Sequence, residues 1–190
     1  MTLLFTGVTT YYQARVSANQ LGQAEENAAR ATREQASRVT FWTDESGDGS
    51  ERLHLKNRSL EPVSDVFMAF YVESVLAVES LFFVDFSISL PALPPCTEVV
   101  ISKEQLRSVG PNGRGPVPSD SSLIGLGVKF YDRDGKGWLR TSGKLEHAPA
   151  DGSIDWADPP SYESNEYVLT KYASGQVKRP LTVKNASPCG

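Results

Sequence analysis

The clearest alternation of apolar and polar positions lies in residues 124–131. Apolar side chains alternate there with glycine, lysine and tyrosine: Ile124, Leu126, Val128 and Phe130 against Gly125, Gly127, Lys129 and Tyr131. This two-residue period is typical of a strand with one buried face. Aspartates and glycines follow at 132–137, where they supply the backbone angles of a reversal, and Trp138 begins a second strand. The pattern predicts a β-hairpin over 124–141, which is information about fold and not about chemistry.

Two other apolar stretches predict long strands at 63–72 and 81–90. The first is apolar on both faces, with Val66, Met68, Phe70 and Val72 on one face and Phe67, Ala69 and Tyr71 on the other. Such a strand is expected at the centre of a sheet, covered on one side by an opposing sheet and on the other by the N-terminal helix or a partner. The second strand is expected to direct its alternate apolar side chains inward: Phe82, Val84, Phe86, Ile88 and Leu90.

Shorter strands are predicted at 39–42, 52–56 and 97–102, with turn residues between them. Together with the hairpin they give about seven strands between residues 39 and 147, the number expected of an immunoglobulin-like domain. The predicted fold is therefore mainly β: an antiparallel immunoglobulin-like β-sandwich of about seven strands, preceded by one N-terminal α-helix. An α/β enzyme fold is disfavoured, because helical periods do not alternate with the strands.

Residues 13–38 are rich in alanine, glutamate, glutamine and arginine and contain no proline, so they predict a helix. Glu26, Arg30, Glu34 and Arg38 recur every fourth residue and form a ladder of opposite charges. When this segment is written as heptads, the positions that would face a partner helix contain one large apolar residue, Leu21. A stable coiled coil needs Leu or Ile at these positions throughout. We interpret this helix as a charged stalk, with weak self-association through it as the alternative.

Residues 1–12 are uncharged and mostly apolar, and they end in Tyr11 and Tyr12 just before the first charge at Arg15. A membrane helix leaves the bilayer in this order, but a span needs about 20 apolar residues. The segment is therefore interpreted as part of a membrane-spanning helix or as a short apolar helix. Arg15, Arg30 and Arg33 on its C-terminal side favour a membrane-associated chain with the β domain on the cytoplasmic side.

Residues 148–190 form a polar segment rich in proline and acidic residues, and they predict a disordered tail. A short added strand at 166–171 is the alternative. The tail ends near Cys189, and the second cysteine, Cys96, follows two prolines. Two cysteines make no disulfide framework, so we interpret them as unrelated thiols and leave their pairing open. The net charge of −4, with no basic stripe, disfavours nucleic acid as a partner.

Candidate chemistry is sparse. The loop at 44–49 resembles the start of a calcium loop, but Leu55 stands at the twelfth position, where a bidentate glutamate is needed. The turn aspartates Asp132 and Asp134 are typical of backbone-capping roles. We predict a hairpin turn in each case, with no metal site and no cofactor.

The two histidines, His54 in a predicted strand and His147 at the start of the tail, are interpreted as surface or edge side chains. The sequence contains no G-x-S-x-G motif and no phosphate-binding loop with a Lys-Ser/Thr ending. We therefore predict no catalytic residues and a protein that is not an enzyme. The alternative is a metal-dependent or hydrolytic enzyme that uses loop carboxylates: Asp44, Asp48, Asp132 and Asp134.

Several of these residues also carry a family resemblance. The run Phe130, Asp132, Gly135, Trp138, Arg140, Gly143 and Leu145 resembles one found in uncharacterised bacterial proteins that join an N-terminal membrane helix, a short charged helix and an immunoglobulin-like β domain. Further matching positions are Tyr11, Tyr12 and Gln13, the stretch 35–42, Asn57, Pro62, Asp65 and Val66, and Leu93, Pro94 and Pro95, with Cys96 where such domains usually have glycine. The resemblance spans about residues 5–145 and implies a membrane-tethered, noncatalytic domain.

The expected function is that of a noncatalytic, membrane-tethered immunoglobulin-like interaction module with an unknown protein partner. Its candidate partner-binding residues are the aromatics Tyr71, Tyr131 and Trp138, each of which has core or hairpin packing as its alternative role. A structural stalk protein that oligomerises through its N-terminal helix is the third hypothesis.

Overall fold

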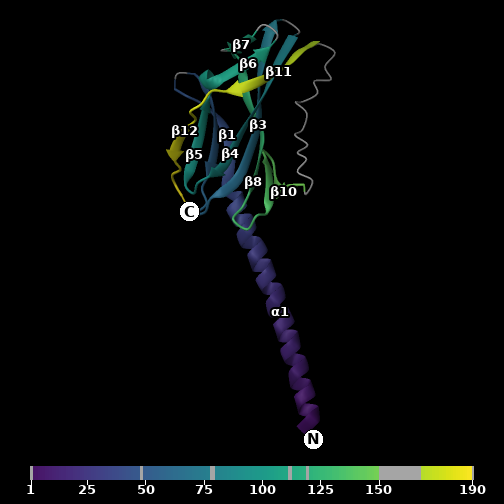
Figure 1. Ribbon diagram of the computed structural model, residues 1–190. Coiled ribbons are helices and arrows are strands. Elements are labelled where there is room, and N and C mark those ends of the chain that lie inside the picture. The colour runs from purple at the N-terminus through teal and green to yellow at the C-terminus, as the bar shows by residue number, and fades with distance from the viewer. Residues whose placement is uncertain are drawn as a thin grey trace. The chain divides into compact units, whose positions relative to one another are not determined.

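The computed structural model describes residues 2–47, 49–77, 80–110, 113–118, 120–149 and 168–189 (Figure 1). The chain divides into two units, Met1–Gln35 and Ala36–Gly190, which we describe separately. The first is helical, and the second, called the β unit below, contains the strands.

Helix α1 extends over Thr2–Ser37, so the predicted helix at 13–38 is confirmed and begins eleven residues earlier than its expected start. Arg30 Nη2 lies 3.7 Å from Glu26 Oε2, one rung of the predicted charge ladder. An exposed pair at this spacing stabilises a helix by about 0.3 to 0.5 kcal/mol. None of the helices in the described part of the chain combines the length and apolar character needed to cross a bilayer.

Strands form two sheets in the β unit. Sheet A has the order β1-β2-β5-β12 and sheet B the order β10-β9-β8-β3-β4-β11-β6-β7. The strands are β1 Val39–Glu45, β2 Glu51–Asn57, β3 Val63–Ala77, β4 Ser80–Leu93, β5 Thr97–Ser102, β6 Leu106–Gly110, β7 Gly113–Pro116, β8 Ser122–Tyr131, β9 Gly137–Thr141, β10 Leu145–His147, β11 Val168–Val177 and β12 Thr182–Asn185, and one short 3-10 helix covers Lys103–Gln105. Among the described residues there are thus twelve strands instead of about seven, and their pairings are antiparallel apart from β11 with β4.

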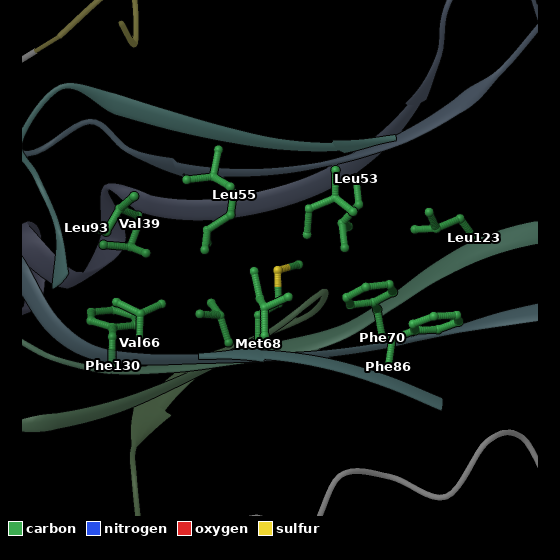
Figure 2. Packing of buried hydrophobic residues seen from close by; sticks show 14 of the residues in the cluster. Val39, Leu53, Leu55, Val66, Met68, Phe70, Phe86, Leu93, Leu123 and Phe130 are labelled. Atoms are coloured by element: carbon green, nitrogen blue, oxygen red, sulfur yellow. The ribbon is translucent and has the colours of Figure 1, made fainter. Parts of the chain in front are cut away.

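The two sheets face each other across one hydrophobic core (Figure 2). Leu53 and Leu55 of β2 point toward Met68 and Phe70 of β3, and Phe70 stacks on Phe86 of β4 with 5.3 Å between ring centroids. Burying each of these side chains stabilises the fold by about 1.5 to 3 kcal/mol. Strand β3 lies between β8 and β4, which confirms the predicted central strand and the inward face of 63–72.

The predicted hairpin is formed by β8 and β9, with Phe130 opposite Trp138. One part of the prediction was wrong, because Ile124 and Leu126 do not share a face with Val128 and Phe130. Gly125 pairs with Phe70 and Gly127 with the adjacent Ala69, so Leu126 is an extra residue that reverses the alternation. A Cβ atom at Gly125 would lie 2.8 Å from the Phe41 ring, so this close approach requires glycine.

The C-terminal segment is not a disordered tail where the structure describes it. Strand β11 adds to sheet B between β4 and β6, and β12 pairs with β5 at the edge of sheet A. The backbone N–H and C=O groups of these strands are hydrogen-bonded to neighbouring strands, a source of order that amino-acid composition does not reveal. The short added strand that was the alternative at 166–171 is confirmed over residues 168–171, which begin β11, while residues 166 and 167 lie outside the described residues. The predicted latching aromatics Trp156 and Tyr162 also lie outside them.

The two cysteines form a disulfide, so the interpretation of unrelated thiols was wrong. The bond joins Cys96, in the turn between β4 and β5, to Cys189, beyond β12, with 5.4 Å between the Cα atoms. Cys96 has φ of 54°, a left-handed conformation that favours glycine, the residue expected there from the family resemblance. The disulfide fastens the end of the chain to the β4–β5 turn.

Candidate functional site

Six side chains form a polar cluster on the outer face of sheet A: Trp42, Asp44, Arg52, His54, Lys56 and Glu98. Their position follows from the two-residue period of β2, in which Leu53 and Leu55 enter the core. Arg52, His54 and Lys56 therefore project from the opposite face. Trp42 pairs with His54 across β1 and β2, and Glu98 pairs with Lys56 across β2 and β5. We call this set the sheet A cluster.

His54 lies at the centre of the sheet A cluster and is only 4% exposed, so its expected place on the surface or at an edge was wrong. Its Nδ1 lies 2.7 Å from Glu98 Oε1 in a hydrogen bond. Its Nε2 lies 3.0 Å from Asp44 Oδ1, a close contact that does not meet hydrogen-bond geometry. The imidazole therefore links two carboxylates from β1 and β5 to the strand between them.

An aromatic and cationic stack adjoins this linkage. The Trp42 indole lies parallel to the His54 ring, with a centroid distance of 4.8 Å and 12° between the planes. Lys56 Nζ lies 5.9 Å from the Trp42 ring centroid and 3.6 Å from Glu98 Oε2, and it donates a hydrogen bond to the Ser187 carbonyl. Through Lys56 the sheet A cluster also holds the chain that follows β12.

Arg52 completes the sheet A cluster from the side of Asp44. Its Nε and Nη2 donate to the two carboxylate oxygens of Asp44 at 3.0 and 3.3 Å, a bidentate pair. Desolvation works to raise the pKa of Asp44, but the hydrogen bonds from Arg52 and the electrostatic attraction of the nearby Arg52 and His54 side chains outweigh it, so the pKa of this carboxyl lies below its usual value of 3.8.

Asp44 therefore makes the free energy of unfolding of the β unit depend on pH in the acidic range. Because its pKa is lower in the folded chain than in the unfolded chain, its contribution is present above pH 3.8 and is lost as the pH falls through the folded value. We expect Asp44→Asn to cost about 0.5 to 1 kcal/mol at pH 7, the range of an exposed ion pair, and the difference from the wild type to shrink below about pH 3.8.

Urea unfolding of both proteins between pH 2 and pH 7 measures this difference. Glu45→Gln, at the end of the same strand, is the matched control. A gap between Asp44→Asn and the wild type that stays constant through this range would contradict the assignment.

The chemistry of the sheet A cluster favours structural or recognition roles over catalysis. A general base must accept a proton from a substrate within hydrogen-bond reach. Both nitrogens of His54 instead lie within 3.0 Å of carboxylate oxygens of the chain itself. The cluster can bind strands together and present Trp42, which is 37% exposed, to a partner.

The aromatic candidates from the sequence are placed differently from one another. Trp138 is 3% exposed in the main core, and its Nε1 donates to Asp132 Oδ2 at 2.7 Å. Tyr71 is buried on the opposite face of sheet B with Ile124 and Leu126. Tyr131 is half-buried, with Lys129 Nζ 5.8 Å from its ring centroid. Burial of Trp138 and Tyr71 supports the packing role, the alternative that the sequence left open.

The predicted turn residues are structural anchors. Asp132 is buried, and its Oδ1 accepts hydrogen bonds from the backbone N–H groups of Asp134 and Lys136, each at 2.9 Å. Both carboxylate oxygens are thus engaged within the β8–β9 hairpin, since Oδ2 accepts from Trp138 of β9. In the β1–β2 turn the Gly49 N–H donates to the Ser46 carbonyl, while Asp48 lies outside the described residues. His147 is exposed at β10, as expected, with its ring 4.3 Å from that of Trp138.

Asn57, one of the residues that carry the family resemblance, is another buried anchor. Its Nδ2 donates to the carbonyls of Glu61, Leu93 and Pro94, and its Oδ1 accepts from Ser59. This amide joins the β2–β3 turn to the β4–β5 turn. At this position the resemblance therefore rests on a residue that fixes two turns.

The sheet A cluster was not found from the sequence because its members come from three strands. His54 and Glu98 are 44 residues apart, and their contact depends on the pairing of β2 with β5. The one local signal was the placement of Arg52, His54 and Lys56 at alternate positions of a strand. Among the described residues, no group of three or more histidine, cysteine or acidic side chains is arranged to hold a metal ion. No family model, curated protein or solved structure matches the chain.

Proposed function

We propose that the chain is a noncatalytic interaction module in which an immunoglobulin-like β unit binds a protein partner and the N-terminal segment holds it at a membrane. The observation that carries the proposal is an apolar groove at one open side of the β unit, lined by residues that include Leu90, Leu181 and Val183. Val183 is 63% exposed although it lies on a strand of a packed sheet. Exposed apolar surface of this kind is typical of a binding site.

The immunoglobulin-like character of the β unit is supported by two facing sheets, a shared core and consecutive antiparallel pairs such as β3 with β4 and β8 with β9. The unit departs from the seven-strand pattern through added short strands and the parallel pair β11–β4. The shared core contains side chains of β2, β3, β4 and β8.

The internal pairing of the candidate carboxylates supports binding over catalysis. Asp44 engages Arg52 and His54, and Asp132 engages its own turn and Trp138. An enzyme that used these loop carboxylates would have to break contacts that stabilise the fold. We therefore keep the hydrolytic or metal-dependent enzyme as the alternative, which the contacts of the described carboxylates do not support.

We propose an oxidising compartment for the β unit. The Cys96–Cys189 bond supports this location, because disulfides persist outside the reducing cytoplasm. The arginines at 15, 30 and 33 favour the cytoplasmic side of the membrane. The positive-inside rule, however, compares the positive charges on both flanks of a span, and these arginines lie on one flank. The disulfide is the more direct argument, because it is a bond within the β unit itself. We therefore propose the oxidising compartment in place of the cytoplasmic location expected from the arginines.

The proposed tether is tested by flotation of the purified chain with liposomes of neutral and anionic lipids. We expect the full chain to float with the liposomes and a version that begins at Gln20 to remain at the bottom of the gradient, because residues 1–12 carry the apolar stretch. A version with Leu3 and Leu4 changed to serine is the matched control for length. Equal recovery of all three proteins in the bottom fraction would remove the tether.

The interaction function is tested with the full chain in its native cells. Photo-crosslinking groups at Trp42, Leu60 and Val183, all exposed apolar positions, should give a specific adduct from Val183. The captured protein is then purified and titrated against the full chain. Failure of the purified protein to bind, or the absence of a specific adduct from all three positions, would refute the interaction function.

A further inference from the structure

We propose that the partner binds as an extended strand that adds to β4 at residues 87–93 and lies beneath β12. This inference rests on the proposed interaction function and names the chemistry of the bound segment. It follows from three features of the same place: an edge of β4 with which no described strand pairs, an exposed inward-facing valine and one arginine.

The first feature is the edge of β4. Strand β3 pairs with β4 along its length, from Ser80 to Leu93, but β11 pairs with it only as far as Asp85. Past Ser174, β11 pairs with β6 and no longer with β4, and the Phe86 ring lies against Gly175, where a Cβ atom would be 2.2 Å from it. Beyond Phe86, β4 therefore has one paired neighbour among the described strands and one open edge.

The backbone groups on that open edge can be assigned. The Ser89 carbonyl accepts a hydrogen bond from Arg179 Nη2 at 3.2 Å, so it faces away from β3. In an antiparallel pair the outward groups belong to alternate residues, so the N–H and C=O of Ser87 face the same edge. Pro91 is the next outward residue and has no N–H, which is tolerated at an edge and ends the run of donors there.

The second feature is Val183 of β12. It pairs with Val99 of β5, which is buried in the core, so both side chains point toward the interior of the two-sheet unit. Val183 nevertheless remains 63% exposed. Strand β12 is the edge of sheet A, and on sheet B the strand that would continue past β4 is absent from the described residues at this level. A strand beside residues 87–93 would cover Val183.

The groove between these two edges determines which side chains the bound strand should carry. Its lining is apolar at Leu90, Leu93, Val99, Leu181 and Val183. Alternate apolar side chains of an added strand would face this lining, while its backbone pairs with Ser87 and Ser89. The bound segment should therefore alternate valine-like and polar residues.

The third feature, Arg179, adds a charge requirement. It is the one charged residue among the described residues that line the groove, and its side chain is exposed. A backbone N–H of the added strand would replace Arg179 as the donor to the Ser89 carbonyl. The released guanidinium could then form a bidentate pair with a carboxylate, so the bound strand should carry an aspartate or glutamate.

The test uses the full chain and a blocked seven-residue peptide that alternates valine with threonine and carries one central glutamate. We expect saturable binding, with amide shifts at Ser87 and Ser89 in NMR spectra. Val183→Asp should weaken binding about tenfold or more, because it removes the burial of a valine. Leu60→Asp is the matched control, since Leu60 is 70% exposed and does not line the groove. It should bind as the wild type does.

Two further arms separate strand addition from general apolar binding. Arg179→Glu should weaken the glutamate peptide and strengthen a peptide with lysine in that place. Methylating alternate peptide nitrogens on the pairing edge should abolish binding, because strand addition needs those donors. Binding that survives Val183→Asp or this methylation would overturn the strand site.

Two outcomes distinguish failure of the site from failure of the function. A partner captured as described above that binds Val183→Asp as tightly as the wild type would overturn the strand site and leave the interaction function standing. Self-association of the chain that Val183→Asp abolishes would overturn the proposal of a separate partner strand.

Discussion

Replacing Cys96 and Cys189 together by serine lowers the free energy of unfolding of the β unit by about 4 kcal/mol. The disulfide joins residues 93 positions apart, so in the unfolded chain it closes a long loop and removes much of its conformational entropy. The loss should appear as an earlier denaturation midpoint in urea, with intact protein in the absence of reductant as the reference.

Two comparisons make this prediction specific. Wild-type protein treated with reductant should unfold at the midpoint of the double serine variant. The pair Cys96→Gly with Cys189→Ser should recover up to about 1 kcal/mol over the double serine variant, because glycine tolerates the positive φ at position 96. Native protein with two titratable thiols, or a double variant within about 1 kcal/mol of the wild type, would contradict the prediction.

Replacing Trp138 by alanine lowers the free energy of unfolding by about 3 to 5 kcal/mol. The side chain is 3% exposed and packs in the main core opposite Phe130. Its loss leaves a cavity and also removes the hydrogen bond from Nε1 to the buried Asp132 carboxylate. Chemical denaturation monitored by circular dichroism measures the change.

Two variants separate the contributions of Trp138. Trp138→Phe keeps most of the buried volume and removes the N–H donor, so it should cost about 1 to 3 kcal/mol through Asp132. Trp42→Ala is the matched control at an exposed tryptophan and should cost about 1 kcal/mol or less. If Trp138→Ala stays within about 0.5 kcal/mol of the wild type, Trp138 is not a core residue.

The two predictions depend on the packing of Trp138 and on the disulfide, and only the first of these could be predicted from the sequence. The position of Trp138 in the hairpin followed from the alternation in 124–131 and the Asp- and Gly-rich turn. The disulfide did not follow, because two cysteines 93 residues apart carry no spacing signal. Its geometry depends on β12 pairing with β5, which brings Cys189 to the β4–β5 turn.

The same distinction applies to the candidate sites. The sheet A cluster requires β1, β2 and β5 in register. The groove requires β12 to lie near the part of β4 that follows its pairing with β11. The polar composition of the C-terminal segment suggested disorder, because such a segment has too few apolar residues to form a core of its own. In the fold, backbone pairing of β11 and β12 with existing strands stabilises them instead.

The sequence by itself determined the helix at residues 13–38, the central strand around Met68 and Phe70, and the hairpin over residues 124–141. These elements are encoded locally, by helix propensity, by a two-residue hydrophobic period and by turn residues. The tertiary structure alone decided the reversal of alternation at Leu126, the burial of His54 between two carboxylates, the disulfide and the groove beside β4. Each depends on which strands pair and where one pairing stops, and that choice is made by long-range contacts that no local pattern encodes.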